Sequence, residues 1–490
     1  MSKLKYKYFY QFKMIFILII LGFIFLQSCE NEQEKELSIV DFDLDKIKER
    51  GKLIALTGYN AYSYFIYKGA PMGYEYELVN KLAEHLGVEV EFKIVREIDK
   101  MFEMLNNGEG DLIAFNLTVT KKRFDKVAFT TYHNTTRQVL VQRRPDNWRD
   151  LTYDQIEDGM LRNPIDLIGR TVTIRRGSAY KQRLLNLSDE IGGDIKIIEA
   201  EADLTIEELI ENVANGSIEY TIADENIAKL VHEYNKNLDY KTQISLDQRI
   251  AWAVRKNAGQ FLSEVDSWIE SMKRKTDYYV IYNKYYKIRN GFKSRVSSEF
   301  FTNKSGKISE YDEVIKSYAD SIGWDWRLLA SQMFQESQFN PNAKSWAGAV
   351  GLMQLMPATI EQYKVLNPID PYENIEGGIK HIVWLDKYWK QFVEDKSERI
   401  KFVLASYNIG LGHIKDAKKL AEKYEAESLI WQDNVERFLL NKSKKRYFSD
   451  EVVLHGYCRG IEAVNYVNEI LTRYGHYRQL LAVEEIGDLG

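Results

Sequence analysis

The 22 residues from Glu336 to Pro357 read E-S-Q-F-N-P-N-A-K-S-W-A-G-A-V-G-L-M-Q-L-M-P. The stretch holds a single acid, Glu336, which stands near the end of a predicted helix among the apolar residues Met333, Phe334 and Phe339. Apolar surroundings disfavour the charged form of a carboxyl, so we expect the pKa of Glu336 to be raised. A carboxyl that stays protonated near neutral pH can act as a general acid, which is what cleavage of a glycosidic bond requires.

The residues after Glu336 predict a tight loop beside it. Asn340-Pro341 ends the helix, and Gly348 and Gly351 let a chain pass close to a bulky group. A groove of this kind suits a sugar. Glu336 is nevertheless one of 72 acidic residues, and an isolated glutamate is usually a solvated surface charge. The interpretation therefore depends on the whole stretch.

This stretch resembles the active-site segment of the soluble lytic transglycosylase family, in which E-S is followed by S-x-x-G-A-x-G-L-M-Q-L-M-P, and the pattern is nearly uninterrupted here. The resemblance implies a mainly α, goose-lysozyme-like fold. It implies cleavage of peptidoglycan glycan strands between N-acetylmuramic acid and N-acetylglucosamine without water. Glu336 would be the catalytic residue, and Ser345 and Gln354 would bind the substrate.

Residues 405–410, A-S-Y-N-I-G, look like the A-Y-N-x-G element of the same family. The likeness implies that Tyr407 and Asn408 line the groove beside Glu336. An aromatic face can stack on sugar C–H groups, and an amide can bond an acetamido group. Asn and Gly at this place would also end a helix, and the two roles are compatible.

Residues 460–467 resemble the E-T-R-x-Y-V segment of the family. Tyr466 is kept, and the resemblance implies that its hydroxyl points at the glutamate or the substrate. Ala463 and Val464 replace the Thr and Arg of the motif, which weakens any role for that polar pair.

The first half of the chain has a different pattern. Short predicted strands alternate with amphipathic helices over residues 52–115 and again over 171–223, which is the order of α/β folds. A predicted strand at 250–255 and an amphipathic helix at 261–272 follow. The pattern predicts an N-terminal α/β domain made of two lobes.

Residues 111–132 read D-L-I-A-F-N-L-T-V-T-K-K-R-F-D-K-V-A-F-T-T-Y and resemble the family 3 extracellular solute-binding proteins, which bind amino acids between two lobes. The resemblance covers residues 50–288. It implies that Arg123 holds a ligand carboxylate, since a guanidinium can form two parallel hydrogen bonds with it. Asn116 and Thr118 would assist Arg123.

The second lobe would contribute two further ligand contacts. Ser178 would open a helix whose free N–H groups favour an anion, and Asp224 would take the amine of the ligand. Taken singly, Arg123 would be a solvated cation and Asp224 a capping residue, so only their joint spacing supports a binding site. The charged, irregular segment 147–164 departs from the family and leaves the hinge geometry open.

Residues 1–28 look like a lipoprotein signal peptide. Four lysines and no acid precede the apolar run 14–26, which is short for a bilayer-spanning helix, and residues 26–29, L-Q-S-C, match a lipobox. We expect a lipid on Cys29 that anchors the protein in the outer membrane facing the periplasm, and a polar tether over 29–49. An uncleaved anchor or an ordinary signal peptide is the alternative.

A chain of 490 residues exceeds one core, and we expect a solute-binding domain over 50–290 and a catalytic domain over 300–480. The net charge of −5 makes the chain a poor nucleic-acid binder, so no such partner is expected. The seven histidines lack metal-ligand spacing, so no metal is expected. Cys458 is the only other cysteine and is expected to be a buried small residue.

The two modules, in this order behind a lipobox, resemble a family of membrane-bound lytic transglycosylases. With one dependable carboxylate, Glu336 must act twice: it protonates the glycosidic oxygen, then removes the proton from the muramic C6 hydroxyl, which attacks its own anomeric carbon. The product is an anhydro-muramic end, and no cofactor is needed. The expected partners are peptidoglycan glycan strands and, in the N-terminal domain, a stem peptide or amino acid that regulates catalysis. The alternative is that this domain only localises the enzyme or has lost its ligand.

Two other functions compete with this one. A lipid-anchored cell-wall sensor would bind peptide and glycan without catalysis, and the replacement of the motif's polar pair favours it slightly. The presence of Glu336 and Tyr466 opposes it, because a binding protein does not need the acid. An amino-acid transport receptor is the third possibility, and the fused C-terminal half opposes that one.

Overall fold

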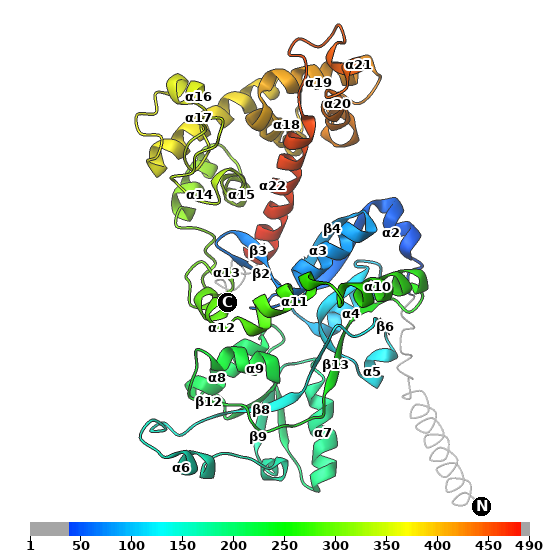
Figure 1. Cartoon of the computed structure of the whole chain (residues 1–490), viewed down its shortest axis with the longest axis vertical. Coiled ribbons are helices and arrows are strands. Elements are labelled where there is room, and N and C mark those ends of the chain that lie inside the picture. The colour runs from blue at the N-terminus through cyan, green and yellow to red at the C-terminus, as the bar shows by residue number, and fades with distance from the viewer. Residues whose placement is uncertain (1–38, 482–490) are drawn as a thin grey trace, which may run out of the picture.

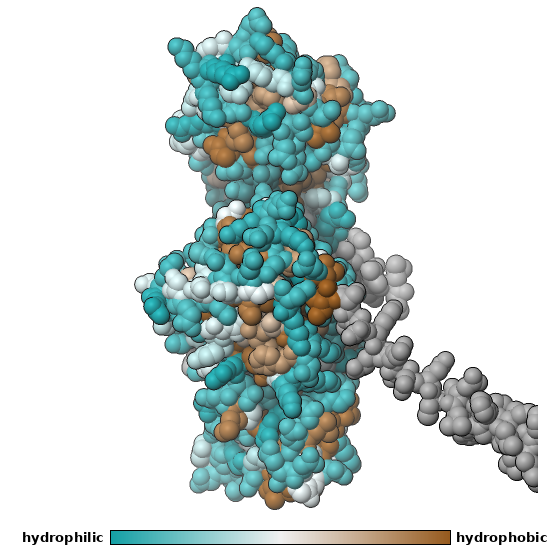
Figure 2. Space-filling model, turned by 90° about the vertical axis from the view of Figure 1, so that its right-hand side faces the viewer, coloured by the Kyte–Doolittle hydropathy of each residue, from teal (hydrophilic) through white to brown (hydrophobic). Residues whose placement is uncertain are grey.

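The computed structural model describes residues 39–481 as two stacked parts, an α/β part and a helical part (Figure 1). The expected signal peptide, Cys29 and the expected tether up to residue 38 lie outside the described residues. Among residues 39–481, no helix combines the length and the apolar character needed to cross a bilayer. Figure 2 shows that hydrophobic residues on one face of the molecule form small groups separated by hydrophilic ones.

The first lobe is built on a six-stranded sheet with the order β4-β1-β5-β13-β6, and β7 pairs with β13. The strands β4, β1 and β5 run parallel, whereas β13 returns from the second lobe and runs antiparallel to β5. The bounds are β1 Lys52–Thr57, α3 Tyr74–Leu86, β4 Glu89–Ile94, α4 Ile98–Asn106, β5 Leu112–Thr118, α5 Lys121–Phe124, β6 Ala128–Phe129, β7 Asn134–Thr136, β13 Gln248–Val254 and α10 Gly259–Met272.

The second lobe has a five-stranded sheet with the order β10-β9-β11-β8-β12. Its bounds are β8 Gln138–Arg143, α6 Tyr153–Asp158, a 3-10 turn Pro164–Leu167, β9 Thr171–Ile174, α7 Tyr180–Ile191, β10 Lys196–Glu199, α8 Ile206–Asn215, β11 Tyr220–Asp224, α9 Glu225–His232 and β12 Leu238–Asp239. The prediction of two α/β lobes is confirmed. The sequence pattern missed β8, because this central strand is buried on both faces and does not alternate.

The last residues of the segment expected to be a tether, 29–49, are helical instead. Leu44–Arg50 forms helix α2, and Ile47 is fully buried. The Asp43 carboxylate accepts hydrogen bonds from the backbone of Gln260 and Phe261 at the start of α10, and Arg50 pairs with buried Asp111. The polar composition of this segment concealed a helix that is held by one apolar residue and these polar contacts.

The junction between the two halves is packed and helical. It contains α11 Thr276–Tyr282, a π-helix Asn283–Lys287, α12 Arg289–Val296 and α13 Thr302–Ser305. Tyr285, Phe292 and Phe301 are buried in the same core as the two lobes. The boundary that we placed near residue 300 therefore falls in a segment that is fixed against the α/β part.

The C-terminal half is helical, as predicted. Its helices are α14 Asp312–Ser321, α15 Trp326–Ser337, α16 Pro357–Tyr363, α17 Pro371–Trp389, α18 Lys396–Ile409, α19 Leu411–Lys423, a π-turn Trp431–Val435, α20 Glu436–Asn441, α21 Lys445–Phe448 and α22 Gly460–Leu481. The long helix α22 packs on both α15 and α18. Cys458, just before α22, is a buried free thiol, as expected.

The far end of α22 docks on the α/β part, where it lies beside the hairpin of β2 (Phe65–Tyr67) and β3 (Ala70–Met72) (Figure 1). The hydroxyl of Tyr64 hydrogen-bonds His476, and the hydroxyl of Tyr477 donates to the carbonyl of Gly69 over 2.6 Å. Gly69 has a φ of +78°, and an added Cβ would lie 2.7 Å from Phe334 of α15. The hairpin of the first lobe thus contacts the helix that carries Glu336.

Candidate active site and ligand cleft

Glu336 lies in the last turn of α15, which ends one residue later. Gln338 and Phe339 then adopt left-handed backbone conformations with φ of 51° and 62°, which are unfavourable for residues other than glycine. Such conformations persist only where the surroundings impose them, and they are concentrated at functional sites. They let the chain turn sharply, so that Phe339 packs on Phe334 and both rings flank the turn that carries Glu336.

The loop after Glu336 is fixed by buried hydrogen bonds. The hydroxyl of Ser337 donates to the carbonyl of Leu352 over 2.8 Å, and the amide of Asn374 holds Met353 and Val350. Gly351 has a φ of +84°, and an added Cβ would lie 2.1 Å from the Asn374 amide nitrogen. Gly351 therefore confirms the prediction that a small residue is needed where the loop passes close to another side chain.

Ser345 and Gln354, which we predicted to bind substrate, are engaged within this loop. The hydroxyl of Ser345 accepts a hydrogen bond from the amide of Ala349 over 3.0 Å. The side-chain nitrogen of Gln354 donates to the carbonyls of Ala343 and Gly351 over 3.1 and 2.9 Å. Both side chains shape the wall of the site, and their contact with substrate stays a prediction.

Tyr466 and Tyr407 lie next to Glu336. The hydroxyl of Tyr466, on α22, donates a hydrogen bond to Oε1 of Glu336. The hydroxyl of Tyr407, on α18, donates to the carbonyl of Met353 over 2.8 Å, which ties that helix to the loop. Asn408, the next residue, is exposed. Three elements far apart in the sequence therefore meet at one carboxyl.

Burial raises the pKa of Glu336 to about 8, although the hydrogen bond from Tyr466 opposes the shift. In the described part of the chain, no second carboxylate contributes to this shift. The Glu336 side chain is only partly covered, so a substrate can reach it. The site therefore offers one protonated carboxyl at neutral pH, as predicted, and this is the requirement for a general acid.

The sequence analysis assigned no role to Asn374, Gln332 or His381. Asn374 is fully buried and holds the loop after Glu336. The sequence feature that could have identified it is the motif Asn374-x-x-Gly-Gly. An added Cβ on Gly378, the last residue of this motif, would lie 2.8 Å from Met353. Gln332 is fully buried one turn before Glu336 and adjoins Tyr466. His381 contacts the ring of Tyr407 at 5.3 Å. The last two give no sequence signal of their own.

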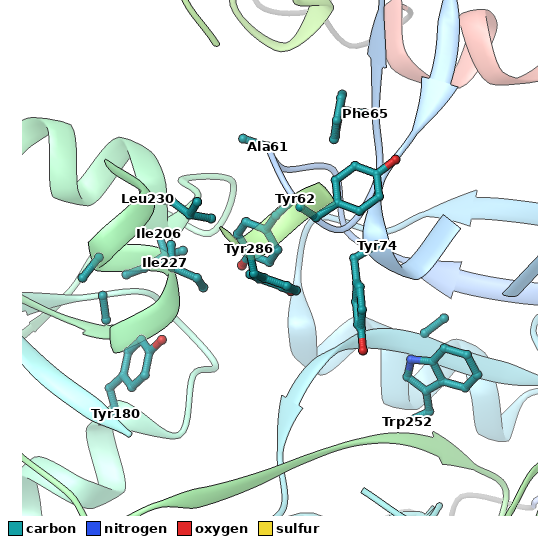
Figure 3. Close-up of a cluster of buried hydrophobic side chains, with 14 of the residues drawn as sticks. Ala61, Tyr62, Phe65, Tyr74, Tyr180, Ile206, Ile227, Leu230, Trp252 and Tyr286 are labelled. Atoms are coloured by element: carbon teal, nitrogen blue, oxygen red, sulfur yellow. The ribbon is translucent and has the colours of Figure 1, made fainter. Parts of the chain in front are cut away.

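In the α/β part, the five predicted ligand residues line a single cavity between the lobes. They are Asn116, Thr118 and Arg123 from the first lobe and Ser178 and Asp224 from the second. Figure 3 shows Tyr62 and Tyr286 between the lobes, with Tyr180 on the second-lobe side. The fold thus brings the five predicted residues together at the cleft between the lobes.

The cleft is closed by polar contacts between the lobes. Asn116 donates to Asp224 over 2.7 Å, and Arg123 donates to the carbonyl of Gly177 over 3.1 Å. The remaining cavity of about 30 Å³ has room for a few water molecules, far less than an amino acid needs. Ser178 donates its hydroxyl to the carbonyl of Arg175, so in this closed state it stabilises the loop before α7.

Two charged residues between the lobes, Arg175 and Glu207, were not predicted from the sequence. Glu207 accepts from the backbone of Ala61 over 2.9 Å, and Arg175 lies over the ring of Phe115, so each links the two lobes. Burial raises the pKa of Glu207 and of Asp224 to about 7. Arg175 lines the cavity, and its Nε is buried without a hydrogen-bond partner in the described part of the chain, which makes it available to a ligand.

We expect digestion of substrate to fall about tenfold per pH unit above pH 8, because Glu336 then loses its proton.

The raised pKa also means that Glu336 favours the folded state below its ordinary pKa and that this contribution is lost as the pH rises through 8. Glu336→Gln should therefore melt at a higher temperature than wild type at pH 9, but not at pH 5. Exposed Glu313→Gln is the control, and equal melting of Glu336→Gln and wild type at pH 9 would contradict the assignment.

Tyr466→Phe should slow digestion roughly ten- to hundredfold, because a hydrogen bond to a charged group is lost when Glu336 acts as a carboxylate. The same change should move the alkaline limb of the pH–rate profile upward, since the lost bond lowers the pKa of Glu336. Tyr474→Phe, on the same helix but bonded to Asp325, should leave the limb in place. A limb that does not move in Tyr466→Phe would show that the hydroxyl does not act on Glu336.

Two family models match the two halves of the chain. Residues 52–288 match the model of bacterial extracellular solute-binding proteins, family 3, and residues 313–430 match the model of the transglycosylase SLT domain. A crystal structure of the ancestral amino acid-binding protein AncCDT-1, a precursor of cyclohexadienyl dehydratase, is 25% identical and covers 50% of this chain and 99% of its own, with a TM-score of 0.41.

Two curated relatives match most of the chain. The membrane-bound lytic murein transglycosylase F of Desulfosudis oleivorans is 35% identical over 438 residues, which cover 89% of this chain and 92% of the relative. The protein of the same name from Photobacterium profundum is 30% identical, with 90% and 82% covered. Because the first of these matches extends along almost the whole of both proteins, the chain belongs to the membrane-bound lytic murein transglycosylase F family.

Proposed function

We propose that the protein is a peptidoglycan lytic transglycosylase that cleaves the bond between N-acetylmuramic acid and N-acetylglucosamine and leaves an anhydro-muramic end. The observation that carries the proposal is the single desolvated carboxyl of Glu336, which accepts a hydrogen bond from Tyr466. Membership of the family supports the same substrate, since its relatives are named for murein.

The proposed reaction uses Glu336 twice. The protonated carboxyl first donates its proton to the glycosidic oxygen, and the bond from that oxygen to the muramic anomeric carbon breaks. The resulting carboxylate then takes the proton of the muramic C6 hydroxyl, whose oxygen forms a new bond to the anomeric carbon. The proton lost in the first step is thereby regained. Tyr466 stabilises the carboxylate between the two steps, and the acetamido group of the sugar shields the positive charge.

The replaced polar pair of the motif does not argue against catalysis. Ala463 and Val464 are buried at 0% and 3% exposure on the face of α22 that packs into the helical core. Apolar residues at these positions help to hold the helix that delivers Tyr466. The competing function, a sensor that binds wall fragments without cleaving them, loses its main sequence argument.

Mass spectrometry of digested sacculi tests the reaction. We expect anhydro-muramic ends from the wild-type chain and no products from Glu336→Gln, because that variant lacks the carboxyl that donates the proton. The variant should keep its melting temperature at pH 5. Reducing ends in place of anhydro ends would exclude the proposed second step, and wild type without any product would favour the sensor.

We further propose that the α/β part binds an amino acid or a stem peptide and thereby changes the activity of Glu336. Arg123 and Arg175 suit a carboxylate and Asp224 suits an amine, so a zwitterion or a peptide end fits the chemistry of the cleft. The cavity must open to admit such a ligand, so the two lobes must be able to adopt an open and a closed arrangement.

One short loop connects this cleft with α22. Tyr62 lines the cavity, Ala61 donates to Glu207 of the second lobe, and Tyr64 hydrogen-bonds His476 of α22. A motion of the second lobe pulls on Ala61 and therefore on the contact of Tyr64 with α22, the helix that carries Tyr466. This gives a continuous packed route from ligand to acid, which regulation of this kind requires.

Calorimetry with stem peptides and free amino acids tests the binding, and Arg123→Ala should abolish it, because the carboxylate loses its partner. Exposed Lys121→Ala is the matched control. Tyr64→Phe should bind the same ligand with unchanged affinity but lose the effect of the ligand on the digestion rate. A ligand that binds wild type without changing that rate would refute the regulatory part.

We also propose that a lipid on Cys29 anchors the protein to the outer membrane, facing the periplasm. The lipobox and the names of the relatives support this. Cys29→Ser should release the protein from membranes without changing the digestion rate of the purified chain, because acyl chains act by burial in the bilayer. Failure of labelled palmitate to enter the wild-type protein would contradict the anchor.

A further inference from the structure

Gln332 is a polar residue in apolar surroundings. It lies on α15 one turn before Glu336, so the two side chains share a face of that helix. Its side chain is fully buried, and its neighbours Leu329 and Met333 are buried in the core of the C-terminal half. A leucine or a methionine would fill the same space without polar atoms. The amide of Gln332 is therefore not explained by packing.

The polar neighbour of this amide is the hydroxyl of Tyr466 on α22. Burial raises the pKa of that hydroxyl well above its usual range, and Gln332 acts in the opposite direction. An N–H group has this effect, because it stabilises the tyrosine oxygen when that oxygen becomes negative. In the part of the chain that the structure describes, both polar atoms of the amide are buried without a well-aligned hydrogen bond. The amide nitrogen is thus a donor kept beside the partner of the acid.

The Tyr466 hydroxyl can meet a protonated Glu336 in two ways. It can donate its own proton to Oε1, which it adjoins, or its oxygen can accept the proton of the carboxyl. In the second arrangement the acidic proton is held by Tyr466 and is not directed to a substrate. A second donor at the tyrosine oxygen favours the first arrangement, because that oxygen then accepts from the amide and keeps its own proton for Oε1.

We propose that Gln332 is a positioning residue, which orients the Tyr466 hydroxyl toward Oε1 of Glu336 and so places the transferable proton on Oε2. The amide nitrogen donates to the Tyr466 oxygen, and the hydroxyl donates to Oε1. After the proton has moved to the glycosidic oxygen, the same two hydrogen bonds stabilise the carboxylate, since each donor polarises the next. The inference rests on the proposed function and adds to it the residue that selects the reactive oxygen.

Other groups near this pair of hydrogen bonds do not set the pKa of Glu336. Tyr407 of α18 also faces the acid, and burial raises its pKa well above the usual range, so it is uncharged at neutral pH. Arg473 and Glu469 of α22 are both hydrogen-bonded to α15. In the described residues, only burial and the Tyr466 hydroxyl shift the pKa of Glu336. A shift that follows removal of the amide therefore reports on Tyr466.

Gln332→Met removes the amide and keeps the length of the side chain, and it is the first test. We expect kcat to fall roughly three- to tenfold with KM unchanged, as for the loss of one hydrogen bond that acts on the acid and not on substrate binding. The alkaline limb of the pH–rate profile should move upward, because the carboxylate of Glu336 loses support. An unmoved limb would overturn the proposal.

Ser331→Ala is the matched control for this substitution. Ser331 is also fully buried on α15, and its hydroxyl donates to the carbonyl of Ile470 on α22 over 2.7 Å. Its loss should loosen the same pair of helices without moving the alkaline limb. An equal movement of the limb in Ser331→Ala and Gln332→Met would show a general effect of packing and would overturn the role of the amide.

A double substitution decides whether Gln332 acts through Tyr466. In the Tyr466→Phe background, Gln332→Met should change neither kcat nor the alkaline limb further, because no hydroxyl remains to be oriented. Additive losses would overturn the proposal. Gln332→Leu removes the amide in the same way and serves as the second variant, and melting at pH 5 shows that each variant is folded.

A titration separates this inference from the proposed reaction. Carbon NMR of the full chain labelled at its glutamate carboxyl groups needs no turnover, and the signal of Glu336 is the one that Glu336→Gln lacks. We expect its titration midpoint to rise by up to about one pH unit in Gln332→Met. An unchanged midpoint would overturn the positioning role. A raised midpoint together with digests that lack anhydro ends would refute the proposed reaction alone.

Discussion

The hydrogen bond from Tyr466 to Glu336 is the interaction on which the rest of the structure depends. Its donor comes from α22, a helix that packs on α15 and α18 and whose other end is docked on the α/β part through His476 and Tyr477. One rigid element therefore places the partner of the acid and joins the two halves. The same helix therefore contacts the α/β part at one end and the carboxyl at Tyr466.

The pKa of Glu336 is raised because most of its side chain is withdrawn from water, and in the described part of the chain no cation lowers it. Burial raises its pKa, and only the Tyr466 hydroxyl opposes the shift. The backbone around Glu336 is strained. Gln338 and Phe339 have left-handed conformations, and Gly351 passes very close to Asn374. The surrounding core absorbs that strain and keeps the site organised before substrate arrives.

Burial also raises the pKa of carboxyl groups at the cleft between the lobes, where cationic side chains lie nearby. Asp224 and Glu207 are buried carboxyls with raised pKa, but Arg123 and Arg175 lie nearby, and each of the four side chains contacts the opposite lobe. The side chains proposed to bind a zwitterionic ligand, Arg123, Arg175 and Asp224, are thus also side chains that close the cleft. Such a ligand would have to replace these contacts, which would couple its binding to the relative position of the lobes.

The sequence by itself determined the two architectures, the acid and most of its neighbours, because these follow from local periodicity and from motifs of fixed spacing. The α/β alternation, the helix before Glu336 and the joint placement of Asn116, Arg123 and Asp224 are of this kind. The folded chain was needed to show which side chains hold the loop, as with Gln354, and which distant residues meet, as with Tyr64 and His476. Contacts between residues far apart in the sequence leave no local pattern, so the docking of α22 and the contact of Arg175 with the first lobe became visible only once the chain was folded.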